Sequence, residues 1–108
     1  MCSFLQLYSG DEGYIVRCSD CMFYQVGFGT SMLTLHETEL DELKVMVQYK
    51  LGDADMLMHD EIKCVWLPAP STNHALLLTY KELKAFAYML EEADTEEKTR
   101  ALLQCFNK

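Results

Sequence analysis

The sequence predicts an α+β domain in which an antiparallel sheet of about five or six short strands packs against two amphipathic helices and a C-terminal helix. Two observations predict this class. Short runs of β-favouring residues bounded by turn residues come first, and stretches with helical spacing follow them. The 108 residues are half hydrophobic and 24% charged, which fits one domain that can fold without metal or disulfides. A single domain over residues 1–108 is therefore expected.

Two hairpins are expected in the first third of the chain. Phe4–Tyr8 and Tyr14–Cys18 read as strands joined by the glycines and acids of Ser9–Gly13. Met22–Phe28 and Met32–Leu35 read as the next pair, and the glycines between them are suited to a reversal.

A helix is expected next, because apolar residues recur at helical spacing with charged residues on the opposite face. The apolar positions are Leu40, Leu43, Met46 and Val47. Gly52 is a natural C-terminal position for this helix, and a polar connecting loop is expected after it.

The remaining elements are a strand pair and two helices. Ile62–Leu67 reads as a strand that the following prolines close, and Ala75–Leu78 reads as its successor. Thr79–Glu82 fits a capping box for a helix with Leu83, Phe86, Met89 and Leu90 as its apolar stripe. Asp94–Glu97 is expected to begin a separate third helix, since acids favour a helix N-terminus.

Comparison of the two halves indicates a candidate internal duplication, over about residues 22–51 and 65–94. Each copy would be a strand, a turn, a strand and a helix, and Cys21 of the first would match Cys64 of the second. The alternative is chance, because any two amphipathic strand-helix units share a periodicity. The matched residues are Leu33, Leu35, Glu39, Leu40 and Met46 with Leu76, Leu78, Glu82, Leu83 and Met89.

The chemically distinctive feature is the Cys18-Ser-Asp-Cys21 corner between two expected strands. Two thiolates at this spacing suit adjacent vertices of a tetrahedral zinc site. A hairpin turn centred between Asp11 and Glu12 would place Leu5 opposite Cys18 and Cys2 opposite Cys21, so that three sulfurs lie at one end of the hairpin.

The sequence therefore predicts a structural zinc site at Cys18, Cys21 and Cys2. Cys64, His59, His74 or a carboxylate would supply the fourth ligand, with Cys64 the candidate retained for it. The alternative is that the cysteines are small core hydrophobes. A redox dithiol is disfavoured, because the residues after Cys21 read as strand rather than as the helix start that lowers a thiol pKa.

Charge and composition exclude several classes of function. A net charge of -8 and a pI near 4.7 oppose binding to nucleic acid or to an anionic membrane, since both carry negative charge. The apolar run at the N-terminus is broken by Gln6 and lacks a basic flank, and no run of about 18 apolar residues occurs. Five cysteines suggest reduced thiols rather than a disulfide framework. A cytoplasmic location is expected.

No pair of residues has a spacing that argues for catalysis, so a non-catalytic role is expected; a small enzyme is the alternative, because active sites can assemble from residues that are distant in sequence. The first strands show little polar alternation, which predicts a homodimer that buries the second face of the sheet. The apolar residues concerned are Tyr14, Val16, Phe23, Val26 and Phe28.

Several short motifs also carry a resemblance to a known family. They are Met1-Cys2, the Gly13-Tyr14 strand leading to Cys18-x-x-Cys21, Tyr24-Gln25, Phe28-Gly29-Thr30, and the Leu-Thr-x-x-Glu-Leu helix start at Leu78–Leu83. On these motifs the chain resembles a family of short, uncharacterised bacterial proteins classed as a domain of unknown function. The resemblance implies a bacterial cytoplasmic protein and supplies no catalytic residues.

Taken together, these patterns predict a small interaction or regulatory module of unknown cellular role with a structural zinc site, whose partner is a protein or a second copy. The alternative is a metal-free α+β binding domain, homodimeric, with its cysteines in the core.

Overall fold

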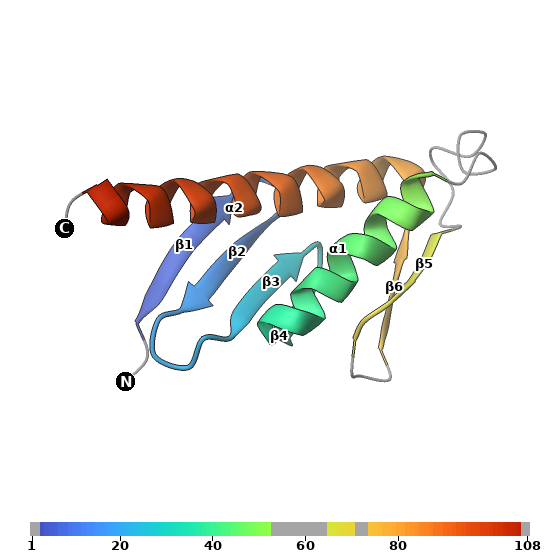
Figure 1. Ribbon diagram of the computed structural model, residues 1–108. Helices are drawn as coiled ribbons and strands as arrows, with labels where there is room; N and C mark the ends of the chain where they lie inside the picture. Colours follow the sequence, from blue (N-terminus) through green and yellow to red (C-terminus); the bar gives the residue numbers. More distant parts are fainter. Residues whose placement is uncertain (1–2, 53–64, 71–73, 107–108) are drawn as a thin grey trace.

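The computed structural model describes residues 3–52, 65–70 and 74–106, and it has the predicted α+β class (Figure 1). Six strands and two helices occur in this part of the chain. In chain order they are β1 (Phe4–Ser9), β2 (Gly13–Cys18), β3 (Tyr24–Phe28), β4 (Ser31–Leu35), α1 (Glu37–Leu51), β5 (Val65–Pro68), β6 (Ala75–Leu78) and α2 (Tyr80–Phe106).

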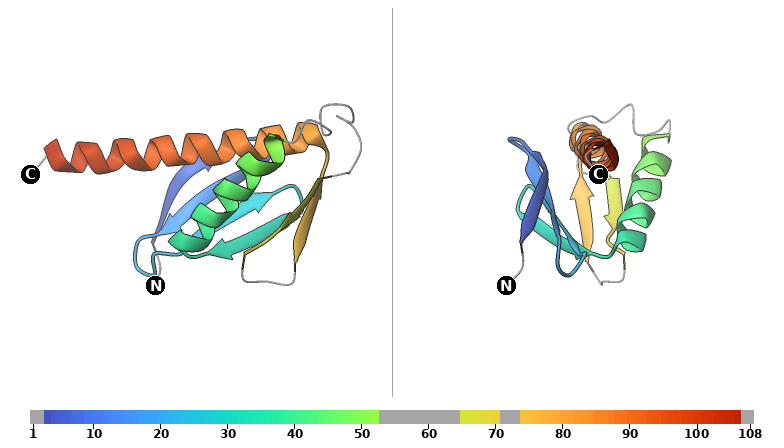
Figure 2. Two further views of the ribbon diagram at one scale, coloured as in Figure 1. Left: turned by 45° about the vertical axis from the view of Figure 1, so that its right-hand side comes forward. Right: turned by 60° about the vertical axis from the view of Figure 1, so that its left-hand side comes forward.

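The strands form two antiparallel sheets rather than the single sheet expected. The first is a four-stranded meander in the order β1-β2-β3-β4, and the second is the hairpin β5-β6. Both helices lie on the same side of the larger sheet, and the hairpin stands beneath the N-terminal end of α2 (Figures 1 and 2). One hydrophobic core is enclosed between these layers.

The inner face of the larger sheet is built from rows of directly opposed residues. Ile15, Val26 and Leu33 face one another across β2, β3 and β4, and all three are buried. Because side chains alternate along a strand, Gln25 and Thr34 lie on the opposite face. The outer face therefore includes polar positions, whereas the homodimer was predicted from an expected lack of polar alternation in these strands.

The apolar residues from which the homodimer was predicted do not all lie on one side of the sheet. Val26 and Phe28 belong to the core, and Phe23 stacks against His36 with ring centroids 4.2 Å apart. Tyr14 is exposed and covers Gly27, where an added Cβ would lie 2.3 Å from the tyrosine ring. This group does not form one continuous apolar face.

The expected register of the first hairpin is wrong beyond its turn. Tyr8 lies opposite Ile15 as expected, but Leu5 lies opposite Arg17, and Phe4 lies opposite Cys18. A β-bulge between Gln6 and Tyr8 causes the shift, because it adds one residue to β1. The extra residue is Leu7, which is buried in the core.

Helix α1 follows the prediction closely. It begins after His36, whose backbone N–H donates to Oε1 of Glu39 at 2.8 Å, and it ends at Gly52. Leu40, Leu43 and Val47 are its buried residues, as the spacing predicted.

Helix α2 is one continuous helix, so the prediction of a separate third helix at Asp94–Glu97 is wrong. The reason lies in the partners of the expected cap residues. The Asp94 carboxylate accepts hydrogen bonds from the side chains of Lys44 and Lys98, and the Thr95 hydroxyl donates to the carbonyl of Glu91. No glycine or proline interrupts residues 80–106, so nothing forces a new helix to begin.

The two strand-strand-helix segments, β3-β4-α1 and β5-β6-α2, have corresponding cap contacts. The backbone N–H of Thr79 donates to Oε1 of Glu82 at 2.9 Å, as that of His36 does to Glu39. The duplication itself stays a prediction, and its match between Cys21 and Cys64 lies partly outside the described residues.

Among the described residues, neither helix combines the length and the apolar character needed to cross a bilayer.

Gly13 provides a test of this packing, because a Cβ added there would lie 1.9 Å from the carbonyl oxygen of Gly27 on the neighbouring strand. We expect Gly13→Ala to lower the free energy of unfolding by about 2 kcal/mol or more, since backbone must move. Urea denaturation measures this loss.

The matched control is Gly52→Ala. Its φ of -78° suits any residue, and the nearest atom to an added Cβ is 3.5 Å away. We expect a change within about 0.5 kcal/mol. Equal stability of the two variants would contradict the close approach of β2 and β3.

Candidate functional site

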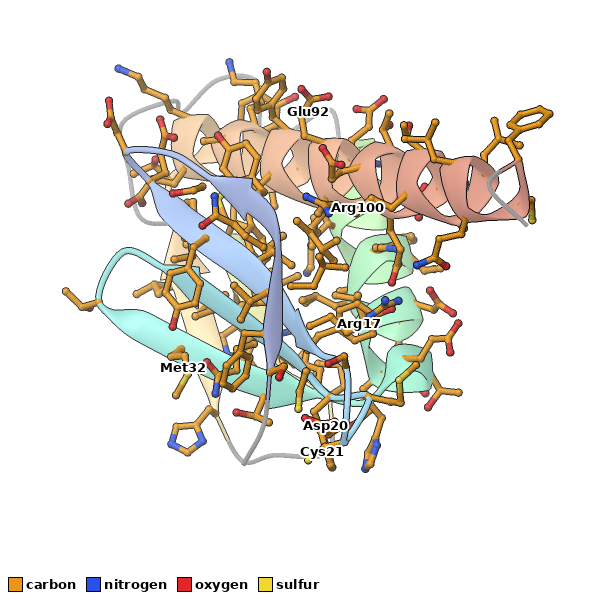
Figure 3. All side chains as sticks on the ribbon, turned by 90° about the vertical axis from the view of Figure 1, so that its left-hand side faces the viewer. Arg17, Asp20, Cys21, Met32, Glu92 and Arg100 are labelled. Carbon is orange, nitrogen blue, oxygen red and sulfur yellow. The ribbon has the colours of Figure 1, made fainter. Side chains whose placement is uncertain are left out.

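The Cys18-x-x-Cys21 corner connects the end of β2 to β3 through a closed turn. The backbone N–H of Met22 donates to the carbonyl of Cys18 at 2.9 Å, and the N–H of Cys18 donates to the carbonyl of Phe23 at 2.8 Å. The chain thus reverses around the two cysteines with its backbone groups paired. Figure 3 shows Asp20 and Cys21 at this turn, at the end of the sheet.

The sulfur of Cys18 lies inside the turn. The backbone N–H of Cys21 donates to Cys18 Sγ at 3.3 Å. Met22 has a φ of 64°, in the left-handed region where glycine is the usual residue. The turn is therefore tight, with a left-handed residue directly after Cys21 although the sequence has no glycine there; we call residues 18–22 the knuckle.

The two cysteines differ in exposure. Cys18 is 3% exposed and belongs to the base of the turn, whereas Cys21 is exposed at its tip. A metal ion would therefore have to reach Cys18 from the side on which Cys21 lies.

The other predicted ligands are not brought to this turn within the described part of the chain. Cys2, Cys64 and His59 lie outside the described residues. His74 lines a hollow of about 420 Å³ between β4 and β6, with Met32 and Leu76. Among residues 3–52, 65–70 and 74–106, no group of three or more His, Cys, Asp or Glu side chains is placed to hold a metal ion.

The N-terminal strand is nevertheless tied to the knuckle. The backbone N–H of Ser3 donates to Oδ2 of Asp20 at 2.9 Å, and the N–H of Ser19 donates to the carbonyl of Ser3 at 2.9 Å. The Ser19 hydroxyl donates to that same carbonyl at 3.1 Å. These hydrogen bonds hold Ser3, the covalent neighbour of Cys2, beside the turn.

A polar cluster that the sequence reasoning missed lies next to the knuckle, on the inner side of the sheet. Arg17 Nη1 is 2.5 Å from Oε2 of Glu97, and the Tyr24 hydroxyl donates to the same oxygen at 2.6 Å. Figure 3 shows Arg17 reaching from the sheet into the space beside the helices. These contacts fasten the middle of α2 to β2 and β3.

Burial raises the pKa of Tyr24 to about 12, and the hydrogen bond to Glu97 adds to the effect. Arg17 opposes it, because its positive charge favours the phenolate. Arg17 Nε is buried and has no hydrogen-bond partner among the described residues, so the cluster is not fully satisfied.

A second ionic group joins the two helices. Lys44 Nζ on α1 is 3.2 Å from Oδ1 of Asp94, and Lys98 Nζ is 2.8 Å from Oδ2 of the same residue. The hydrogen bond from Lys98 lowers the pKa of Asp94, burial opposes this, and Lys44 adds to the lowering. The sequence contains a weak indication of both ionic clusters. Arg17 is a charged residue within an otherwise apolar strand, and Asp94 and Glu97 follow Leu90 at helical spacing, on the face that packs against the core.

Neither a family model, nor a curated protein, nor a solved structure matches the chain. The roles of its residues must therefore be argued from the geometry alone.

The Tyr24 environment gives a prediction at alkaline pH. The folded-state pKa lies above the ordinary value of 10.0, so unfolded chains lose this proton first as the pH rises. The stabilisation is complete below about pH 10 and is lost between about pH 10 and pH 12. The hydrogen bond to Glu92 also raises the pKa of Tyr88, so absorbance titration of phenolate formation should show late ionisations, of which Tyr24→Phe removes one.

The control is Tyr49→Phe on the exposed side of α1, which should leave that late ionisation in place. If Tyr24→Phe did not change the titration above pH 10, the contact between Tyr24 and Glu97 would be contradicted.

Proposed function

We propose that the chain is a small, non-catalytic protein-interaction module whose N-terminal strands are held by a structural zinc ion. The ion would be bound by Cys18, Cys21 and Cys2, with Cys64 as the candidate fourth ligand. Cys2 and Cys64 lie outside the described residues, so their part rests on the sequence.

The observation that carries the metal site is the conformation of the knuckle. The backbone N–H of Cys21 donates to Cys18 Sγ, Met22 has a left-handed backbone conformation, and both cysteines belong to the same turn. Zinc prefers thiolate ligands, and its structural sites use cysteine pairs at this spacing. The hydrogen bonds of Ser3 to Ser19 and Asp20 support Cys2 as the third ligand, because they hold its neighbour beside the turn.

Bound zinc would cross-link the start of the chain to the β2–β3 turn. Strand β1 is an edge strand that pairs with β2 alone. A metal link to the turn would therefore stabilise its N-terminal end, which has a neighbouring strand on one side only. This role is structural, and the proposal assigns no catalytic residue. The same proposal includes the bacterial cytoplasmic setting that the family resemblance implies.

The interaction role rests on exposed apolar side chains that gather on the helices. Val45 and Tyr49 project from α1, and Leu102, Leu103 and Phe106 project from the end of α2. Large exposed apolar groups in such clusters are typical of protein-binding surfaces. The internal duplication, with a matched strand pair and helix in each half, remains part of the proposal as the origin of the two helices.

One observation favours the alternative of a metal-free binding domain. Cys18 is as buried as the core leucines, and a small buried side chain at a tight turn needs no metal to explain it.

Elemental analysis of the purified protein tests the metal site. We expect about one zinc ion per chain without added metal, and loss of this zinc in the variant Cys18→Ser/Cys21→Ser. The thermal midpoint should fall together with the zinc content, because binding free energy contributes to folding. Cys2→Ser should weaken zinc retention during dialysis against a chelator.

The matched control is Cys105→Ser, which removes an exposed thiol from the end of α2 and should leave the zinc content unchanged. A metal-free wild-type protein, with the same midpoint in the double variant, would establish the metal-free alternative instead.

A further inference from the structure

The end of α2 projects beyond the body of the molecule. Every residue of the helix from Lys98 to Phe106 is exposed, whereas buried and half-buried positions alternate with exposed ones before it. Figures 1 and 2 show this end of α2 extending past the edge of the sheet at β1. At about 1.5 Å per residue, the exposed end is about 13 Å long.

This end carries an apolar stripe on one side. Leu102, Leu103 and Phe106 have the helical spacing of a single face, and they are 58%, 55% and 76% exposed. We call these three residues the α2 tip. Large apolar side chains that are exposed together on one face are typical of a surface that a partner covers.

A second apolar surface lies on the outer side of α1. It is a shallow hollow of about 660 Å³, lined by Asp41, Glu42, Val45, Met46 and Tyr49. Val45 and Tyr49 are 69% and 74% exposed. We call it the α1 hollow.

We propose that the partner of each surface is the other surface on a second copy of the chain. The α2 tip of one copy lies in the α1 hollow of its partner, and the partner's α2 tip lies in the α1 hollow of the first. The contacts are reciprocal, as two-fold symmetry requires. This inference rests on the interaction role proposed above and is independent of the zinc site.

Charge complementarity favours this pairing. The exposed end of α2, residues 98–106, carries Lys98 and Arg100 and no acidic residue, although the chain as a whole has a net charge of -8. Two of the residues that line the α1 hollow, Asp41 and Glu42, are acidic, and Lys44 Nζ lies 3.9 Å from Oδ1 of Asp41. Pairing of tip with hollow therefore brings opposite charges together, whereas pairing of two hollows would bring acids against acids.

The existing partners of the two basic residues do not oppose this arrangement. Lys98 pairs with Asp94, and Arg100 pairs with Glu96 at 3.0 Å, both across one helical turn. Exposed ion pairs of this kind contribute little, so a new pairing at the interface costs little.

The area also favours a reciprocal contact. Three large, half-exposed side chains bury roughly 300 Å² on each contact surface, and two reciprocal contacts bury roughly 1,200 Å² in all. That total is at the lower limit for a specific complex, whereas one contact alone would fall well below it. A closed dimer is therefore favoured over an open chain of copies.

Sedimentation or light scattering at several protein concentrations, with a reductant to prevent disulfides through Cys105, tests the proposal. We expect a dimeric wild-type protein, and a rise of about a hundredfold or more in the dimer dissociation constant for Leu103→Glu and for Val45→Glu separately. Each change buries a charge at one of the two surfaces.

The matched control is Leu77→Glu, because Leu77 is also a leucine about half exposed, 56%, but lies on β6. It should remain dimeric. Phe106→Ser and Tyr49→Ser repeat the test with polar changes at side chains that contribute nothing to the core, and thermal unfolding verifies that each variant is folded.

Mixing identifies the pairing. The Leu103→Glu and Val45→Glu variants together keep one intact tip and one intact hollow, so at high protein concentration the mixture should associate weakly, but more than either variant alone, which keeps no intact contact.

A monomeric wild-type protein would overturn the dimer. Retention of the dimer in Val45→Glu would overturn the tip-in-hollow pairing in favour of tips against tips, and its loss in Leu77→Glu would place the interface on the hairpin. Zinc content measured on the same samples keeps the two proposals separate, since a zinc-loaded monomer overturns only the dimer and a metal-free dimer only the zinc site.

Discussion

Packing of α2 against the inner face of the four-stranded sheet is the interaction on which the rest of this structure depends. An antiparallel sheet with an apolar inner face must be covered, and α2 covers it together with α1. The Phe28 and Phe86 rings, with centroids 4.9 Å apart, join sheet and helix at the centre of this contact. Leu83 and Met89 complete the buried stripe, and the hairpin β5-β6 packs beneath the first turns of the same helix. Helix α1 and strand β6 also contact α2.

The helix is longer than the surface it covers, and its chemistry changes where the cover ends. Apolar contacts hold the first part, and charged contacts of Asp94 and Glu97 with Lys44 and Arg17 hold the last part that still touches the body. None of these charged side chains is fully buried, so water still reaches the ion pairs and reduces the cost of desolvation. The contact of α2 with the rest of the molecule is therefore apolar in its middle and charged at the point where α2 leaves the sheet.

Much of the architecture could be predicted from sequence because it follows from local chemistry. Alternation and turn residues located the strands of the meander, and the capping box at Thr79–Glu82 located the start of α2. The failures have non-local causes. The bulge at Leu7 depends on how β1 fits the core, and the continuity of α2 depends on Lys44, which is remote in sequence and satisfies Asp94 from another helix. The corner at Cys18 and Cys21 was predicted from the sequence, but the left-handed conformation of Met22 was not, since methionine is not a residue that favours it.

The bulge in β1 also affects how the protein behaves among its own copies at high concentration. Strand β1 is an outer strand of the meander, and a regular outer strand is a template on which another chain can add by backbone hydrogen bonding. An extra residue interrupts the even spacing of donors and acceptors and increases the local twist, so an incoming strand cannot match it along its whole length. The bulge that places Leu7 in the core thereby also protects this edge of the sheet against aggregation.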